Sequence, residues 1–182
     1  TFLNHGSYGA CPVPIFEDYQ TWQRKLEQQP VKFLKTDIWN ALRNSRLSLS
    51  EFVGCNEDEI LFFHNPTSAI ANVINSLQLN EGDEVLMTDH EYGALVRQWN
   101  LWGEKNNVKI IQQKIPVPVS SKEELVETFW RGVTKKTKVI FISQITSPTA
   151  IIFPIKQVVR MARDREILTI IDGAHVPGHI DI

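Results

Sequence analysis

Short apolar runs alternate with helical segments from Glu59 onward, and this alternation restricts the fold more than any other feature. The runs cover residues 60–63, 84–87, 109–115, 139–142 and 167–171. Helical patterns lie between them, over 69–79, from Gly93 to about Lys105, after a Ser121/Glu124 capping box, and over 155–165. Strands that alternate with helices of this length are typical of βαβ units. The sequence therefore predicts an α/β fold with a mostly parallel sheet.

The first fifty residues have a different pattern. Residues 15–29 place Phe16, Tyr19 and Trp22 on one helical face, and a second apolar-periodic stretch over 31–52 stops near Gly54. We expect residues 1–54 to form an N-terminal arm with helices, and residues 55–182 to form the main domain.

Composition excludes several classes of partner. The 182 residues are 42% hydrophobic and 22% charged, as in ordinary soluble proteins, and the net charge of −2 offers no broad basic field for nucleic acid or anionic lipid. No apolar run approaches the roughly 20 residues of a membrane span. Cys11 and Cys55 have neither metal-binding nor redox spacing, which favours a reducing, cytoplasmic setting. Because the chain starts at Thr1 and stops just after an unusual loop, we expect a fragment of a longer protein.

Four polar segments follow apolar runs: HNPTS, TDHEYG, SQITSP and DGAHVPG. Ligands of parallel α/β sheets bind outside the carboxyl ends of the strands, so these segments are the candidate site. The last one follows the run 167–171, which reads as a strand buried on both faces. A buried carboxylate at Asp172 needs a cationic or hydrogen-bonding partner, although an isolated aspartate there could be a cap or turn residue.

The other polar side chains each have two interpretations. Thr67 and Ser68 start a helix and could bind phosphate, or one of them could be the N-cap. His90 and Tyr92 could stack on a planar ligand, or be a surface imidazole and a half-buried ring. The hydroxyls of Thr146 and Ser147 could contact a ligand, or cap a loop. These pairs are candidates, and the residues alone leave both interpretations open.

Several catalytic motifs are missing from the sequence. It has no GxGxxG after a strand, no GxxxxGK[ST] and no GxSxG elbow. His175 and His179 have the i, i+4 spacing of helical metal ligands, but Pro177 and Gly178 between them disfavour a helix. We therefore predict no metal site.

A phosphate cradle, a stacking ring, hydroxyls and a strand-end aspartate together describe a pyridoxal 5'-phosphate (PLP) pocket. FLNHGSYGACP, ITSPTAIIFPI and DGAHVPGHI resemble motifs of fold-type-I PLP enzymes of the class V aminotransferase group, most closely isopenicillin N epimerase-like proteins. The resemblance covers nearly the whole chain. It implies a three-layer sandwich that forms part of a PLP-binding large domain, and a homodimer.

The resemblance also implies roles for individual residues. Asp172 and His175 would be the catalytic residues: Asp172 would pair with the pyridine nitrogen, and His175 would lie near the phenolic oxygen or the Schiff base. Tyr92 would stack on the ring, with His90 as second choice. Thr67 and Ser68 would bind the phosphate, and Thr146 and Ser147 would lie beside the phenolic oxygen. Asn4 and His5 would lie near the entrance for the substrate.

Two features depart from the family pattern. Pro66 lacks the N–H that this position of the phosphate loop could offer. The Schiff-base lysine of the family lies downstream of the strand-end aspartate, whereas the last of the chain's eleven lysines is Lys156. The sequence thus predicts a cofactor pocket that these 182 residues do not complete.

The predicted function of the intact protein is PLP-dependent chemistry at the α-carbon of an amino acid or amino-acyl peptide, as in isopenicillin N epimerase. The alternatives are a cysteine desulfurase or C–S lyase of the same family, a non-catalytic relative with the PLP fold, and a metal-dependent hydrolase that uses Asp172, His175 and His179.

Overall fold

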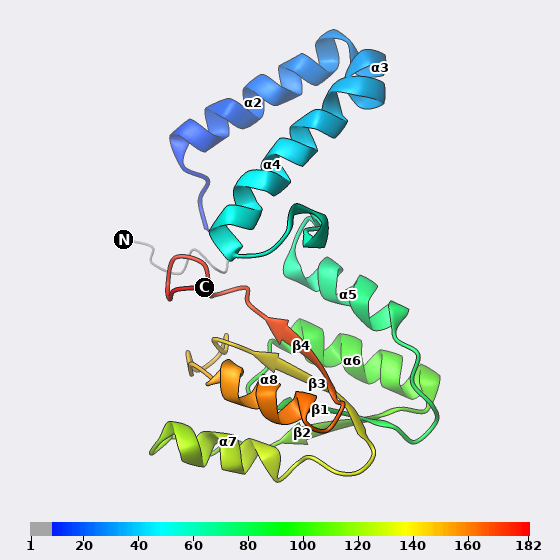
Figure 1. The fold of residues 1–182 in the computed structure, drawn as a ribbon, viewed down its shortest axis with the longest axis vertical. Helices are drawn as coiled ribbons and strands as arrows, with labels where there is room; N and C mark the ends of the chain where they lie inside the picture. The colour runs from blue at the N-terminus through cyan, green and yellow to red at the C-terminus, as the bar shows by residue number, and fades with distance from the viewer. Residues whose placement is uncertain (1–8) are drawn as a thin grey trace. The chain divides into compact units, whose positions relative to one another are not determined.

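The structure, a computed structural model, describes residues 9–182. The chain divides into two compact units, one that ends at Phe62 and one that spans Phe63–Asp181 (Figure 1). Each is described by itself. Asn4 and His5, the predicted substrate residues, lie outside the described part of the chain.

The first unit is helical. Its elements are α2 (Val13–Gln28), α3 (Pro30–Lys32), a π-helical turn η1 (Phe33–Asp37), α4 (Ile38–Val53) and a 3₁₀ turn η2 (Glu57–Glu59). Gly54 ends α4 in the left-handed conformation, with φ of 72°, as predicted. The predicted helix 15–29 is confirmed as α2, which buries none of its residues. In the described part of the chain, no helix combines the length and apolar character needed to cross a membrane.

The second unit contains a four-stranded sheet in the order β2-β1-β3-β4, and every neighbouring pair is parallel. The strands are β1 (Glu84–Thr88), β2 (Lys109–Gln113), β3 (Thr137–Ser143) and β4 (Leu168–Asp172). The helices are α5 (Pro66–Ser76), α6 (Gly93–Asn106), α7 (Lys122–Trp130) and α8 (Ile155–Arg163). The predicted α/β class and parallel sheet are confirmed.

Helices cover both faces of this sheet, which makes three layers (Figure 1). On one face, Ile74 of α5 and Trp99 of α6 pack against Phe141 of β3. On the other face, Phe129 of α7 and Val158 of α8 belong to a second apolar cluster. Because β1 and β3 are buried from both sides, their apolar runs are nearly continuous.

Two predictions about strands are wrong. Residues 60–63 form no strand: the Ile60 amide closes the η2 turn onto Glu57, and Leu61 is 79% exposed. In the described chain, this segment pairs with no neighbouring strand, although its residue types favour β-structure. The run before Asp172 is also not buried on both faces, because Leu168 at its start is half exposed and Thr169 and Ile171 are only partly buried.

Close packing of α6 against β2 gives a stability prediction. A Cβ on Gly103 would lie 2.8 Å from both the Ile110 side chain and the Val108 carbonyl oxygen, which is backbone and cannot rotate away. Gly93, at the start of the same helix, has only Arg97 at 3.8 Å. We expect Gly103→Ala to be less stable than Gly93→Ala by about 1–3 kcal/mol, because both gain helix propensity and only the first is overpacked. Urea unfolding of the two variants measures this difference, and equal stabilities would contradict the packing.

Candidate active site

Three of the four predicted polar segments meet at the carboxyl edge of the sheet. They follow β1, β3 and β4, which are neighbours in the sheet order, and Ser143 and Asp172 are paired in register. The fourth segment, HNPTS, follows no strand and leads directly into α5. Helix α5 runs back toward the start of β1, so its N-terminus faces the same edge (Figure 1).

Asp172 is the last residue of β4 and is only 8% exposed. Its Oδ1 accepts a hydrogen bond of 2.9 Å from the Ala174 amide, and its carbonyl accepts one from the Gln144 amide. Within residues 9–182, no Lys, Arg or His nitrogen lies within 4.0 Å of its carboxylate. A buried carboxylate without a basic partner is poorly compensated, so this group suits a cationic ligand atom.

His175 is half-buried in the turn that follows β4. Its backbone carbonyl lies 2.7 Å from Nδ1 of His179, so the second imidazole is bonded to backbone. Among the described residues, no three His, Cys, Asp or Glu side chains come together as metal ligands.

His90 and Tyr92 follow β1 and have contrasting environments. His90 is 9% exposed, with Nδ1 at 2.9 Å from Thr149 Oγ1 and Nε2 at 2.8 Å from the Ile115 carbonyl oxygen. Tyr92 precedes α6 and is 44% exposed. The imidazole therefore holds two loops together, while the phenol ring is open to a ligand.

Thr146 is buried and stabilises its own loop. Its Oγ1 accepts from the Ile151 amide at 2.8 Å and lies 2.9 Å from Thr149 Oγ1. This is the loop-capping role that the sequence left open as an alternative. Ser147 is exposed.

The start of α5 is capped by Asn65, so the expectation that Thr67 or Ser68 could be the N-cap is wrong. Asn65 Oδ1 accepts from the Ser68 amide at 2.8 Å, and the Ser68 hydroxyl donates to the Asn65 carbonyl. An asparagine side chain at this position reaches the free amide of the first turn better than the two residues already inside the helix. Thr67 makes no hydrogen bond through its amide or hydroxyl within the described chain, which leaves both for an anion.

Glu91 also lies at this edge of the sheet, and the sequence analysis did not select it. It is 5% exposed, and its carboxylate accepts from the Thr88 hydroxyl at 2.6 Å and from both the amide and the hydroxyl of Ser143. Burial raises the pKa of Glu91, these hydrogen bonds oppose the rise, and the charge of Asp172 adds to it. The available signal was an acidic residue in a polar segment directly after a buried strand.

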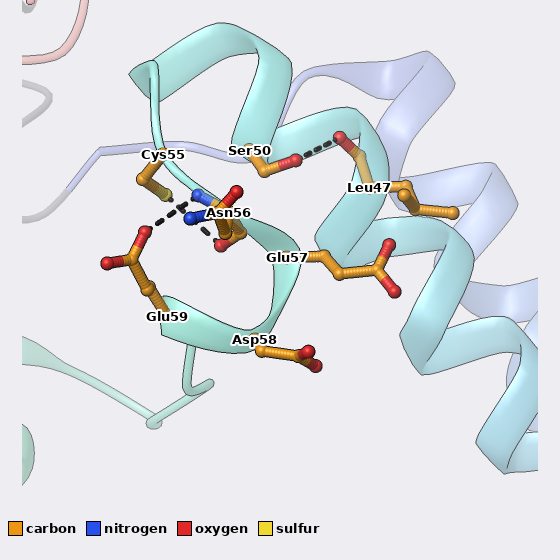
Figure 2. Close-up of a pocket in the computed structure, with 7 residues that line it drawn as sticks. All are labelled: Leu47, Ser50, Cys55, Asn56, Glu57, Asp58 and Glu59. Atoms are coloured by element: carbon orange, nitrogen blue, oxygen red, sulfur yellow. Dashed lines mark hydrogen bonds between the residues drawn. The ribbon is translucent and has the colours of Figure 1, made fainter.

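The helical unit has a separate pocket of about 550 Å³ between the end of α4 and the η2 turn (Figure 2). Leu47, Cys55, Glu57 and Asp58 are among its lining residues. It contains none of the predicted site residues, so it is not the candidate active site.

Known proteins resemble the chain over its whole length. It is 31% identical to an isopenicillin N epimerase of Amycolatopsis lactamdurans, and the match covers 100% of the chain and 46% of that protein. It is 24% identical to a probable chloroplastic L-cysteine desulfhydrase of Arabidopsis thaliana, over 99% of the chain and 41% of that protein. The chain thus spans about half the length of the curated relatives it matches.

The fold also matches solved structures. A complex of the cystine C–S lyase C-DES with cysteine persulfide superposes with a TM-score of 0.87 at 18% identity, covering 100% of this chain and 49% of that one. The family model for class-V aminotransferases matches residues 15–182. The predicted resemblance is confirmed: the chain belongs to the class-V aminotransferase family, and this membership implies pyridoxal 5'-phosphate as its cofactor.

Proposed function

We propose that the full protein is a PLP-dependent enzyme that acts at the α-carbon of an amino acid or amino-acyl peptide. The observation that carries this proposal is Asp172, a buried carboxylate at the carboxyl edge of the sheet with no basic partner in the described chain. A protonated pyridine nitrogen is the cation that this carboxylate fits.

The N-terminus of α5 offers donors that fit the phosphate of the cofactor. Thr67 offers an amide and a hydroxyl at the N-terminus of α5, where the helix dipole favours phosphate, and the amide and hydroxyl of Ser68 would donate to phosphate in place of their bonds to Asn65. Pro66 takes the first helical position, so its missing N–H removes one phosphate donor. When bound, PLP supplies an electron sink for the substrate α-carbon. Asp172 keeps the ring nitrogen protonated, which sustains that sink.

We assign the stacking position to Tyr92 and not to His90. A stacking ring must have an open face, and Tyr92 is 44% exposed whereas both ring nitrogens of His90 are bonded to other loops. We keep His175, Thr146 and Ser147 as neighbours of the phenolic oxygen. The Thr146 hydroxyl is bonded within its own loop, so Thr146 would act on the phenolic oxygen by holding that loop in place. Asn4 and His5 stay as the proposed substrate residues.

For the reaction, we propose epimerisation, with C–S bond cleavage as the second candidate. The epimerase of Amycolatopsis lactamdurans is 31% identical to the chain, against 24% for the Arabidopsis desulfhydrase, which favours the first. The fold likeness to a C–S lyase favours the second. In both cases the residues of this chain bind and polarise the substrate–cofactor pair, and the lysine that anchors the cofactor is one outside these 182 residues.

We further propose that the protein works in the cytoplasm as a homodimer. Cys11 and Cys55 are both free and exposed, as suits a reducing compartment. Exposed apolar residues of α2, including Phe16 and Tyr19, offer surface for a second subunit.

The full-length protein tests the proposal directly. Purified with PLP and reduced with borohydride, it should carry one PLP on a lysine, and peptide mapping should place that lysine beyond Ile182. Solvent deuterium entering the α-position without loss of sulfur would indicate epimerisation, whereas sulfide or persulfide release from cysteine or cystine would indicate C–S cleavage. Failure to bind PLP would contradict the proposal.

Removal of the Asp172 charge should weaken cofactor binding. Asp172→Asn keeps the shape of the side chain but cannot form a charge-assisted bond to the pyridine nitrogen. Because such a bond contributes about 1.5–3 kcal/mol, PLP affinity should fall by about 10- to 100-fold. Titration of the cofactor-free protein with PLP measures the change, and an unchanged affinity would refute the assignment of Asp172.

Tyr92 and His90 should fail in different ways when truncated. Tyr92→Ala removes a stacking ring that contributes about 0.5–1.5 kcal/mol, so PLP affinity should fall about two- to tenfold while the melting temperature changes little. Tyr92→Phe, the control, should retain the affinity. His90→Ala removes two buried hydrogen bonds and should chiefly lower the melting temperature. The reverse pattern would assign the stacking role to His90.

A further inference from the structure

Glu91 joins two strands of the sheet at the edge where the cofactor is proposed to bind. The last residues paired between β1 and β3 are Leu86 and Ile140. Beyond that pair, the Glu91 carboxylate accepts from the Thr88 hydroxyl at the end of β1 and from the Ser143 amide, at 3.0 Å, at the end of β3. The buried carboxylate therefore takes over the connection where the backbone ladder stops.

The residue that Glu91 holds is the register partner of Asp172. Ser143 pairs with Asp172 across β3 and β4, and the next amide, that of Gln144, donates to the Asp172 carbonyl at 2.9 Å. Glu91 and Asp172 thus lie at the ends of a short chain of hydrogen bonds and register contacts that crosses the carboxyl edge of the sheet. Both side chains are less than a tenth exposed.

The two carboxylates also interact through their charges. Burial raises the pKa of Glu91, and the charge of Asp172 raises it further. A charge on Glu91 would also attract a cation bound at Asp172. Solvent screens this interaction little because both groups are buried.

We propose that Glu91 is a positioning residue of the PLP site: it fixes the end of β3, against which Asp172 of β4 is paired, and adds a second negative charge that favours the protonated pyridine nitrogen. This inference rests on the proposed function. Glu91 is held by three donors and does not contact the ring, whereas Oδ2 of Asp172 has no hydrogen-bond partner among residues 9–182 and is available to the ring. Glu91 thus acts on the cofactor through Asp172.

The test compares two probes in the cofactor-free, full-length protein at pH 8: PLP itself and a PLP analogue with C–H in place of the ring nitrogen. Glu91→Gln keeps the size of the side chain and an acceptor oxygen but removes the charge. We expect it to weaken PLP binding at least about threefold and to change binding of the analogue by less than about twofold. The ratio of the two affinities within one variant cancels any loss of folded protein.

Thr88→Val is the matched control, because it removes one donor to Glu91 and leaves the Glu91 charge. It should lower the melting temperature and leave the PLP-to-analogue affinity ratio within about twofold of the wild type. Equal weakening of both probes by Glu91→Gln, or no weakening of either, would overturn the inference while the proposed function stands. A wild-type protein that binds neither probe would overturn both.

Discussion

The parallel pairing of β1, β3 and β4 is the constraint on which the candidate site depends. Parallel strands end at the same edge of a sheet, so the pairing of β1, β3 and β4 brings together Thr88, Ser143 and Asp172, which are far apart in sequence. Burial from both sides by helices makes this edge a place where polar groups have few water partners. Each of them must then be satisfied by the protein or by a ligand.

Two buried carboxylates at this edge show the two outcomes. Glu91 accepts three hydrogen bonds from the adjacent strand ends, so its burial costs less and it serves the scaffold. Asp172 accepts one bond to its carboxylate, from the turn that follows β4, and has no basic partner in the described chain. The contrast separates a group that builds the site from one that is directed at a ligand.

Much of the second unit could be predicted because two of its strands, β1 and β3, are buried on both faces. Continuous apolar runs at 84–87 and 139–142 mark such strands, and the polar segments after them mark the edge where a ligand binds. The run at 60–63 is also apolar but has no neighbouring strand in the described chain, and apolar composition alone does not show whether a partner strand is present. Pairing is a tertiary property, which is why this prediction failed.

The site was harder to predict than the fold. Hydroxyls and imidazoles after a strand can bind either a ligand or the protein, and only the three-dimensional contacts distinguish these roles. His90 is bonded to a neighbouring loop, and Thr146 is bonded within its own loop. The N-cap of α5 is Asn65, which the sequence analysis did not select. Glu91 was missed because its partners, Thr88 and Ser143, are 55 residues apart in the sequence.

The protonation state of the bound ring nitrogen tests the central claim most directly. Nuclear magnetic resonance of the full-length protein loaded with PLP labelled with ¹⁵N in the ring would report it through the ¹⁵N chemical shift. The account predicts a protonated nitrogen in the wild type near neutral pH and an unprotonated one in Asp172→Asn. An unprotonated nitrogen in the wild type, or the same shift in both proteins, would show that Asp172 does not face the cofactor.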